Sequence, residues 1–180
     1  GLGFALIAGA GFEATGALAG PLLVDAGVGL DATGVFFGVP VVLAMLAGGL
    51  AGGWFSDRNE RRRTVGRGLV LLSTLVIALG VARFLDAPGT VLMGVLTLVY
   101  FAIGLFTASS YALFMDLTDP RLGATQFSTF MAATNGCEAW AVALGGVAVA
   151  SAGYGPTLVG MAGLGLLGFV LLPPLSRLRG

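Results

Sequence analysis

Long apolar stretches separated by short polar segments dominate this chain. Residues 32–55 and 87–115 contain no charged residue, and residues 68–85 contain only Arg83. A helix needs about 20 apolar residues to cross a bilayer, and the absence of apolar–polar alternation argues against a β-barrel. The pattern predicts an all-α membrane protein with six transmembrane helices, near residues 3–24, 33–55, 67–85, 90–115, 122–150 and 155–175.

The composition agrees with a membrane location and excludes several functions. Of 180 residues, 57% are hydrophobic and 10% are charged, whereas soluble domains contain about 25% charged residues. The chain has neither lysine nor histidine, which excludes a P-loop, Ser-His or Cys-His catalysis and an ordinary zinc site. Cys137 is the only cysteine. The sequence contains no basic patch with interleaved aromatic residues, which is the pattern that indicates nucleic-acid binding. We expect no enzyme, no metal, no cofactor and no nucleic-acid partner.

Nearly all arginines fall on one side of the predicted bundle, and only Arg83 falls on the other. The positive-inside rule places the arginine side, and with it both ends of the segment, in the cytoplasm. We therefore expect a protein of the plasma membrane, which in a bacterium is the inner membrane. The chain begins with Gly1 and not with methionine, so we expect an upstream part to be missing. The arginines on this side are Arg58, Arg61, Arg62, Arg63, Arg67, Arg121, Arg177 and Arg179.

Small residues and prolines suggest how the spans pack. Glycines at four-residue spacing favour close contact between helices. Pro40 is expected to kink the second span, and Pro173-Pro174 to end the sixth. The glycine pairs are Gly16/Gly20, Gly34/Gly38, Gly48/Gly52 and Gly49/Gly53.

Polar side chains at depth distinguish the first, fourth and fifth spans from the other three. In the fourth span Tyr100, Thr107 and Tyr111 share one helical face. In the fifth span Asn135 and Glu138 also share a face. Polar groups inside a bilayer are costly unless they pair or meet water. We therefore predict that these three helices line one aqueous cavity and that the others support them.

Two carboxyl groups are the sharpest signals for function. Glu13 and Glu138 lie near the middle of the first and fifth spans, with no basic residue at that depth. Burial disfavours the ionised form, so such a group can take up a proton on one side and release it on the other. Alternatively, each is a protonated carboxyl bonded to a neighbouring helix, or the partner of a base in a missing segment. The predicted substrate-binding or proton-coupling residues are Glu13, Tyr100, Thr107, Tyr111, Asn135 and Glu138.

The connection between the second and third spans carries an ordered motif at residues 53–63. It resembles the G-x-x-x-D-R-x-G-R-[RK] motif of major facilitator superfamily transporters, with Glu60 in place of the second glycine. The resemblance implies the C-terminal half of such a transporter, helices seven to twelve, with the N-terminal half missing. It also implies a conformational latch between the two halves, although any arginine cluster would serve as a cytoplasmic anchor. The matching residues are Gly53, Asp57, Arg58, Arg61 and Arg62.

A second resemblance narrows the branch of that superfamily. Residues 115–127 are similar to the stretch before the eleventh helix of anhydromuropeptide permeases and acetyl-CoA transporters, and Asn135-Gly136 also fits the acetyl-CoA transporter pattern. Within the stretch, Asp119 is expected to cap the fifth span, with Pro120 at its first position. The resemblance implies a permease that works by alternating access. Its cargo would be a sugar-peptide or a coenzyme-type anion, driven by protons.

Two other functions fit six spans. One is the substrate-binding subunit of a vitamin importer, which has a similar length. The other is a non-transporting assembly factor on the same fold, which would not need Glu13 or Glu138.

Overall fold

The computed structural model describes residues 1–172, which are helical almost throughout and contain no strand. Five helical segments are long and apolar enough to cross a membrane, which indicates a membrane protein. The first consists of α1 (Leu2–Ile7) and α2 (Ala10–Asp25), and the second of α3 (Leu30–Phe36), the π turn η1 (Phe37–Val41) and α4 (Val42–Arg58). The others are α5 (Arg61–Phe84), α6 (Gly89–Asp116), and α8 (Tyr154–Leu167) with the 3-10 turn η2 (Gly168–Leu171).

The predicted fifth span forms helix α7 (Gly123–Ala152), which is not among these five apolar helices. Its 30 residues are enough to cross a bilayer. However, Gln126, Asn135 and Glu138 make it less apolar than its neighbours. The described structure therefore contains five apolar helices and one long helix with polar groups.

The connection expected between the second and third spans, residues 56–66, is wrong, because most of this segment is helical. Helix α4 continues to Arg58 and helix α5 begins at Arg61, so only Asn59 and Glu60 connect them. The third helix thus begins earlier than the expected residue 67. Arginine is a good helix former, and its long side chain allows a charged first turn to remain helical at a membrane surface.

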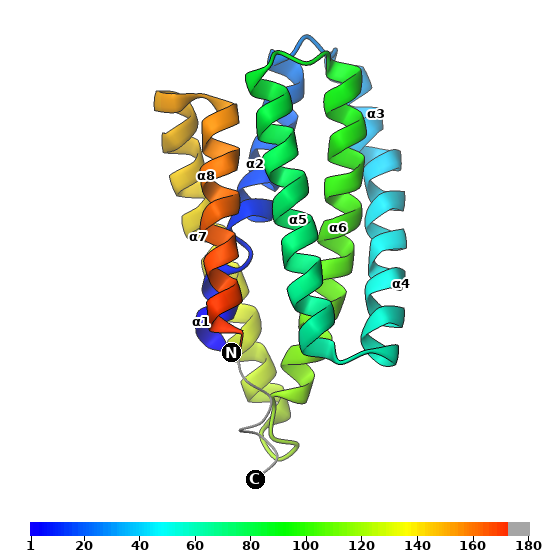
Figure 1. Cartoon of the computed structure of the whole chain (residues 1–180), viewed down its shortest axis with the longest axis vertical. Coiled ribbons are helices and arrows are strands. Elements are labelled where there is room, and N and C mark those ends of the chain that lie inside the picture. The colour runs from blue at the N-terminus through cyan, green and yellow to red at the C-terminus, as the bar shows by residue number, and fades with distance from the viewer. Residues whose placement is uncertain (173–180) are drawn as a thin grey trace.

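The helices run up and down along the long axis of the molecule (Figure 1). The connections after α2, α5 and α7 lie at one end, and those after α4 and α6 lie at the other end with the N-terminus. The α4–α5 arginines and Arg121 therefore share one end, while Arg83 lies toward the opposite end. We call these the arginine end and the outer end. Arg177, Arg179 and the predicted stop at Pro173-Pro174 lie outside the described residues.

The helix contacts show an internal relation between the first three and the last three spans. The main contacts are α4 with α6, α5 with α6, α5 with α8, α2 with α8, and α1 and α2 with α7. Each contact has a counterpart when the first, second and third spans are matched with the fourth, fifth and sixth. For example, the contact of the second span with the fourth corresponds to that of the fifth span with the first. The two three-helix units therefore pack on each other in equivalent ways.

The closest helix contact in the bundle involves glycines of α4 and α6. A Cβ atom on Gly48 would overlap the carbonyl of Phe101, and one on Gly104 would overlap the carbonyl of Met45. A Cβ on Gly52 would likewise overlap the carbonyl oxygen of Leu105. By contrast, a Cβ on Gly16, Gly20, Gly34 or Gly38 would meet no atom of residues 1–172 within 4 Å beyond its own stretch of helix. The predicted close contact is thus present at Gly48/Gly52 and absent at these other two pairs.

The second span is irregular at the predicted proline position. Pro40 lies inside the π turn η1, between α3 and α4. Proline has no N–H to donate and clashes with the preceding turn of an α-helix, and π turns are a usual place for a helix to change direction. Beside this turn, the rings of Phe36 and Phe37 pack edge to face at 5.3 Å. The irregular turn therefore lies where the second span meets the aromatic core.

The outer end is held together by side chains from α2, α5 and α8. The Tyr154 hydroxyl donates a 2.8 Å hydrogen bond to the Asp25 carboxylate. The Arg83 guanidinium pairs with Asp86 at 2.7 Å and lies 6.0 Å from the centre of the Tyr154 ring. These contacts connect three spans at one surface.

Candidate functional site

A cavity of about 230 Å³ lies between the first span, α6 and α7. These are the three helices whose polar residues predicted a shared cavity. Five of the six predicted site residues line it, and they come from all three helices. They are Glu13, Thr107, Tyr111, Asn135 and Glu138.

Aromatic rings form the base of this cavity. Phe4 packs against Phe106 at 6.2 Å and against Phe114 at 6.3 Å, and Phe12 packs against Phe106 at 6.0 Å. Sequence reasoning missed these rings because phenylalanine is ordinary in a membrane helix. A sequence signal exists only in α6, where the eight-residue spacing of Phe106 and Phe114 places both rings near one face of the helix, because Phe4 and Phe12 lie in two different helices, α1 and α2. The cavity is therefore a polar rim on an apolar, aromatic base.

The polar groups of the rim have no partner within residues 1–172. No hydrogen bond or ion pair there reaches the side chains of Glu13, Tyr111, Asn135 or Glu138. The hydroxyl of Ser110, which also lines the cavity, is buried and has no partner in the same part of the chain. Such groups require water, a solute or another protein surface when the helices lie in a bilayer.

The cavity is open on the side of α7. Glu13 is half-buried, whereas Asn135 and Glu138 are exposed and Tyr111 is 36% exposed. Cys137, between the two exposed residues of α7, is 1% exposed and faces inward. The described helices thus form the base of the cavity and one of its walls. They leave open the side on which Asn135, Glu138 and Tyr111 are exposed.

Tyr100, the sixth predicted site residue, does not line the cavity. Its ring is buried and packs edge to face against Phe37 at 5.9 Å. Tyr100 and Tyr111 share a face of α6, but eleven residues at 1.5 Å per residue separate them by about 16 Å along the helix. At the level of Tyr100 the second span covers α6, as the packing of Gly104 on Met45 also shows. The sequence pattern showed that the two tyrosines share a helical face, but it did not show that they lie at different depths along the helix.

The residues predicted to form the latch separate into different environments. Arg61 donates to the carboxylate of Asp116 and, at 3.3 Å, to the carbonyl of Ala112, so it ties α5 to α6. Its guanidinium lies 3.7 Å from Asp57, which remains 75% exposed. The Arg58 guanidinium lies 4.2 Å above the ring of Trp54. Asp57 and Arg61 are therefore brought together, and Arg58 is held against its own helix.

Two further latch residues lie apart from this ion pair. Gly53 is half-buried, and a Cβ there would meet no atom of the described residues within 4 Å beyond its own stretch of helix. Arg62 lines a groove beside Phe169 and Leu172, which does not include Asp57. The structure therefore does not bring all five residues into one cluster.

The predicted cap of the fifth span is wrong. Helix α7 begins at Gly123 after Leu122, and no side chain caps it. The Asp119 carboxylate instead accepts a 2.8 Å bond from the backbone N–H of Arg121, and the Asp119 N–H donates to Gln126 at 2.7 Å. Asp119 is thus used in the turn that precedes the helix.

Trp140 connects two helices next to the cavity. Its indole N–H donates a 2.9 Å hydrogen bond to the carbonyl of Leu6, which ties α7 to α1 beside the cavity.

Within residues 1–172, no group of three or more His, Cys, Asp or Glu side chains is placed to hold a metal ion. No model of a known protein family matches this chain, and no curated protein matches it.

Proposed function

We propose that the chain is the C-terminal six-helix half of a transporter of the major facilitator superfamily type. It would move a small polar or anionic solute by alternating access, coupled to protons. The observation that carries this proposal is the cavity, because three separate helices place Glu13, Thr107, Tyr111, Asn135 and Glu138 around one hollow. A bundle with a purely structural role has no need to gather partnerless polar groups in its membrane-spanning part.

The open side of the cavity supports a second bundle as its missing wall. Asn135, Glu138 and Tyr111 are exposed on that side. Facing lipid, they would leave a carboxyl, an amide and a phenol without partners in hydrocarbon, which is costly. A facing six-helix half would enclose them and leave space for solute and water.

The contact pattern gives a second, independent support. Transporters of this class contain two three-helix repeats within each six-helix half. The equivalence of the first three and last three spans in this chain fits that organisation. The resemblance of residues 53–62 to the superfamily motif supports the same assignment.

Each cavity residue has a role in this proposal. Glu138 and Glu13 carry the proton, and Thr107, Tyr111 and Asn135 supply hydrogen bonds to the solute. Asp57 is exposed near the end of α4. In this proposal its carboxylate contacts the N-terminal six-helix half of the transporter. The arginine end lies in the cytoplasm, as the positive-inside rule requires.

A transport assay with the complete native polypeptide tests the proposal. Vesicles containing it are given an imposed pH gradient and a labelled anhydromuropeptide or acetyl-CoA as probe. We expect Glu138→Gln to abolish accumulation against a gradient while preserving expression and solute exchange. Asp31→Asn removes an exposed carboxylate outside the cavity, so it should accumulate solute like the unmodified protein. Normal accumulation by Glu138→Gln would refute the proton role.

The mass of the native polypeptide separates this proposal from its alternatives. A chain about twice this length is expected for a twelve-helix transporter. A native chain of 180 residues would instead favour the subunit of a vitamin importer. An assembly factor would be indicated if the loss of both Glu13 and Glu138 left the cellular function intact.

A further inference from the structure

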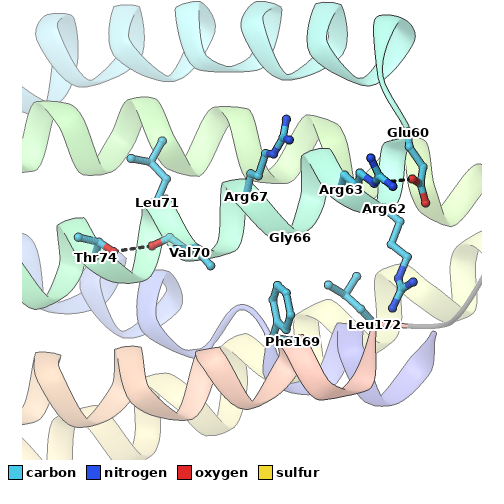
Figure 2. Close-up of a pocket in the computed structure, with 10 residues that line it drawn as sticks. All are labelled: Glu60, Arg62, Arg63, Gly66, Arg67, Val70, Leu71, Thr74, Phe169 and Leu172. Atoms are coloured by element: carbon cyan, nitrogen blue, oxygen red, sulfur yellow. Dashed lines mark hydrogen bonds and ion pairs between the residues drawn. The ribbon is translucent and has the colours of Figure 1, made fainter.

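A second, larger hollow lies at the arginine end, on the outside of the bundle. It measures about 720 Å³ and runs between the first turns of α5 and the turn η2. Figure 2 shows its ten lining residues. They are Glu60, Arg62, Arg63, Gly66, Arg67, Val70, Leu71, Thr74, Phe169 and Leu172. We call this hollow the arginine groove.

The arginine groove has a basic mouth and an apolar floor. Arg62 extends from α5 toward Leu172, while Arg67 rises on the other side of the same helix (Figure 2). Farther along α5, Val70 and Leu71 continue the groove into the apolar part of the bundle. The glycine at position 66 keeps the floor open, because a Cβ there would lie 3.2 Å from the ring of Phe169.

The charges of the mouth are not balanced within the described chain. Arg63 pairs with Glu60 at 2.7 Å. Among residues 1–172, no carboxylate pairs with Arg62 or Arg67. Within the described residues, the groove therefore holds two guanidinium groups without a carboxylate partner, which makes it a candidate site for an anion.

The depth of these arginines specifies where the anion must come from. Helix α5 has 24 residues, so at 1.5 Å per residue it is about 36 Å long, against about 30 Å for the hydrocarbon core. Its first turn, with Arg62, falls in the headgroup layer, and Arg67 lies near the boundary with the acyl chains. An arginine at that boundary turns its guanidinium toward the headgroups. Phosphate is the anion found at this level of a membrane.

We propose that the arginine groove binds an anionic phospholipid. The lipid phosphate lies against Arg62, whose side chain extends toward Leu172, because a guanidinium binds phosphate through paired hydrogen bonds, and Arg67 adds positive charge from the other flank of the groove. One acyl chain follows Val70 beside Phe169. Basic recesses between membrane helices on the cytoplasmic side suit such headgroups. The proposal depends only on the helices lying in a membrane, and not on the proposed transport.

A lipid-retention experiment tests this assignment. The chain is purified in detergent, delipidated and mixed with equal amounts of phosphatidylglycerol and phosphatidylcholine, and the retained lipids are counted by native mass spectrometry. We expect preferential retention of phosphatidylglycerol. Because each arginine contributes about a fivefold effect near an anionic lipid surface, Arg67→Gln should weaken its binding about fivefold, and the double variant with Arg62→Gln about 25-fold.

Arg121→Gln is the matched control, because Arg121 is exposed at the same end but does not line the groove. It should retain phosphatidylglycerol like the unmodified chain. Equal retention of the two lipids, or an equal loss in Arg67→Gln and Arg121→Gln, would overturn the proposal. Displacement of the lipid by glycerol phosphate alone, at the same concentration, would also overturn it, because the site would then bind a free anion. If circular dichroism shows that Arg67→Gln does not fold, the single variant Arg62→Gln decides the question.

Discussion

The close contact between α4 and α6 predicts that Gly48→Ala destabilises the bundle. A Cβ at Gly48 would overlap the carbonyl oxygen of Phe101, and it would lie 2.8 Å from the carbonyl carbon and 3.0 Å from the N of Leu105. All three are backbone atoms, which cannot rotate away as a side chain can. The two helices must therefore move apart to accept a single methyl group.

The size of the effect follows from two opposing contributions. Ordinary Cβ contacts begin at 3.4 Å, whereas the carbonyl carbon lies at 2.8 Å and the carbonyl oxygen lies nearer still, so the carbon sets only the lower limit of the shift that the helices must make. Overpacking of this kind costs about 1–3 kcal/mol, while alanine is about 1 kcal/mol better than glycine inside a helix. Because the overlap involves three backbone atoms, its cost lies at the upper end of this range, and we expect a net loss of about 2 kcal/mol in the free energy of unfolding. For a chain of this length that corresponds to a fall of about 4–8 °C in Tm.

Thermal unfolding in detergent, followed by circular dichroism, measures this loss. Gly49→Ala is the control, because its Cβ would meet only the Gly104 carbonyl at 4.0 Å, an ordinary contact. Gly49→Ala should therefore match or exceed the Tm of the unmodified chain. If both variants unfold at the same temperature, the helices do not approach each other as closely at Gly48 as described, and the reasoning fails.

Three further results are expected. In the transport assay, Tyr111→Phe should weaken solute uptake, whereas Tyr100→Phe, which lies outside the cavity, should not; a loss in both would show that depth does not separate them. A small methanethiosulfonate reagent should modify Asn135→Cys, placed in a Cys137→Ser background, much faster than it modifies the buried native Cys137, and similar rates would contradict the inward position of the thiol. Finally, Tyr154→Phe removes the hydrogen bond from the Tyr154 hydroxyl to Asp25 at the outer end. In the same unfolding assay it should lower the free energy of unfolding by about 0.5–1.5 kcal/mol. An unchanged Tm would show that this hydrogen bond does not stabilise the outer end.

The sequence indicated which polar side chains would gather around one cavity, because a bilayer restricts where polar groups can go. Glu13, Thr107 and Glu138 lie on three different helices, and only a shared hollow lets them meet water or a solute. The aromatic base was not predictable in the same way, because Phe106 and Phe114 look like any apolar residue. Tyr100 was misplaced because helical periodicity gives the direction of a side chain but not which neighbour covers it at that level.

Helix ends were less predictable than helix positions. A run of arginines reads as a loop, yet Arg61 begins α5 and bonds to α6 through Asp116. That tertiary contact cannot be seen from local sequence. The same holds for Asp119, whose carboxylate can satisfy either a helix end or a preceding turn, and in this chain satisfies the turn.

The π turn at residues 37–41 determines how the second span responds to a change in its length. A π turn closes hydrogen bonds one residue farther along than an α turn, so it accommodates one residue more than a regular helix of the same extent. Deleting Gly38 would therefore let the turn close as an α turn and leave Phe36 on the face that packs in the core. Deleting a residue from the regular helix α4 would instead rotate one part of the span by about 100° relative to the other. The second span thus tolerates a change of length at this turn better than within α4.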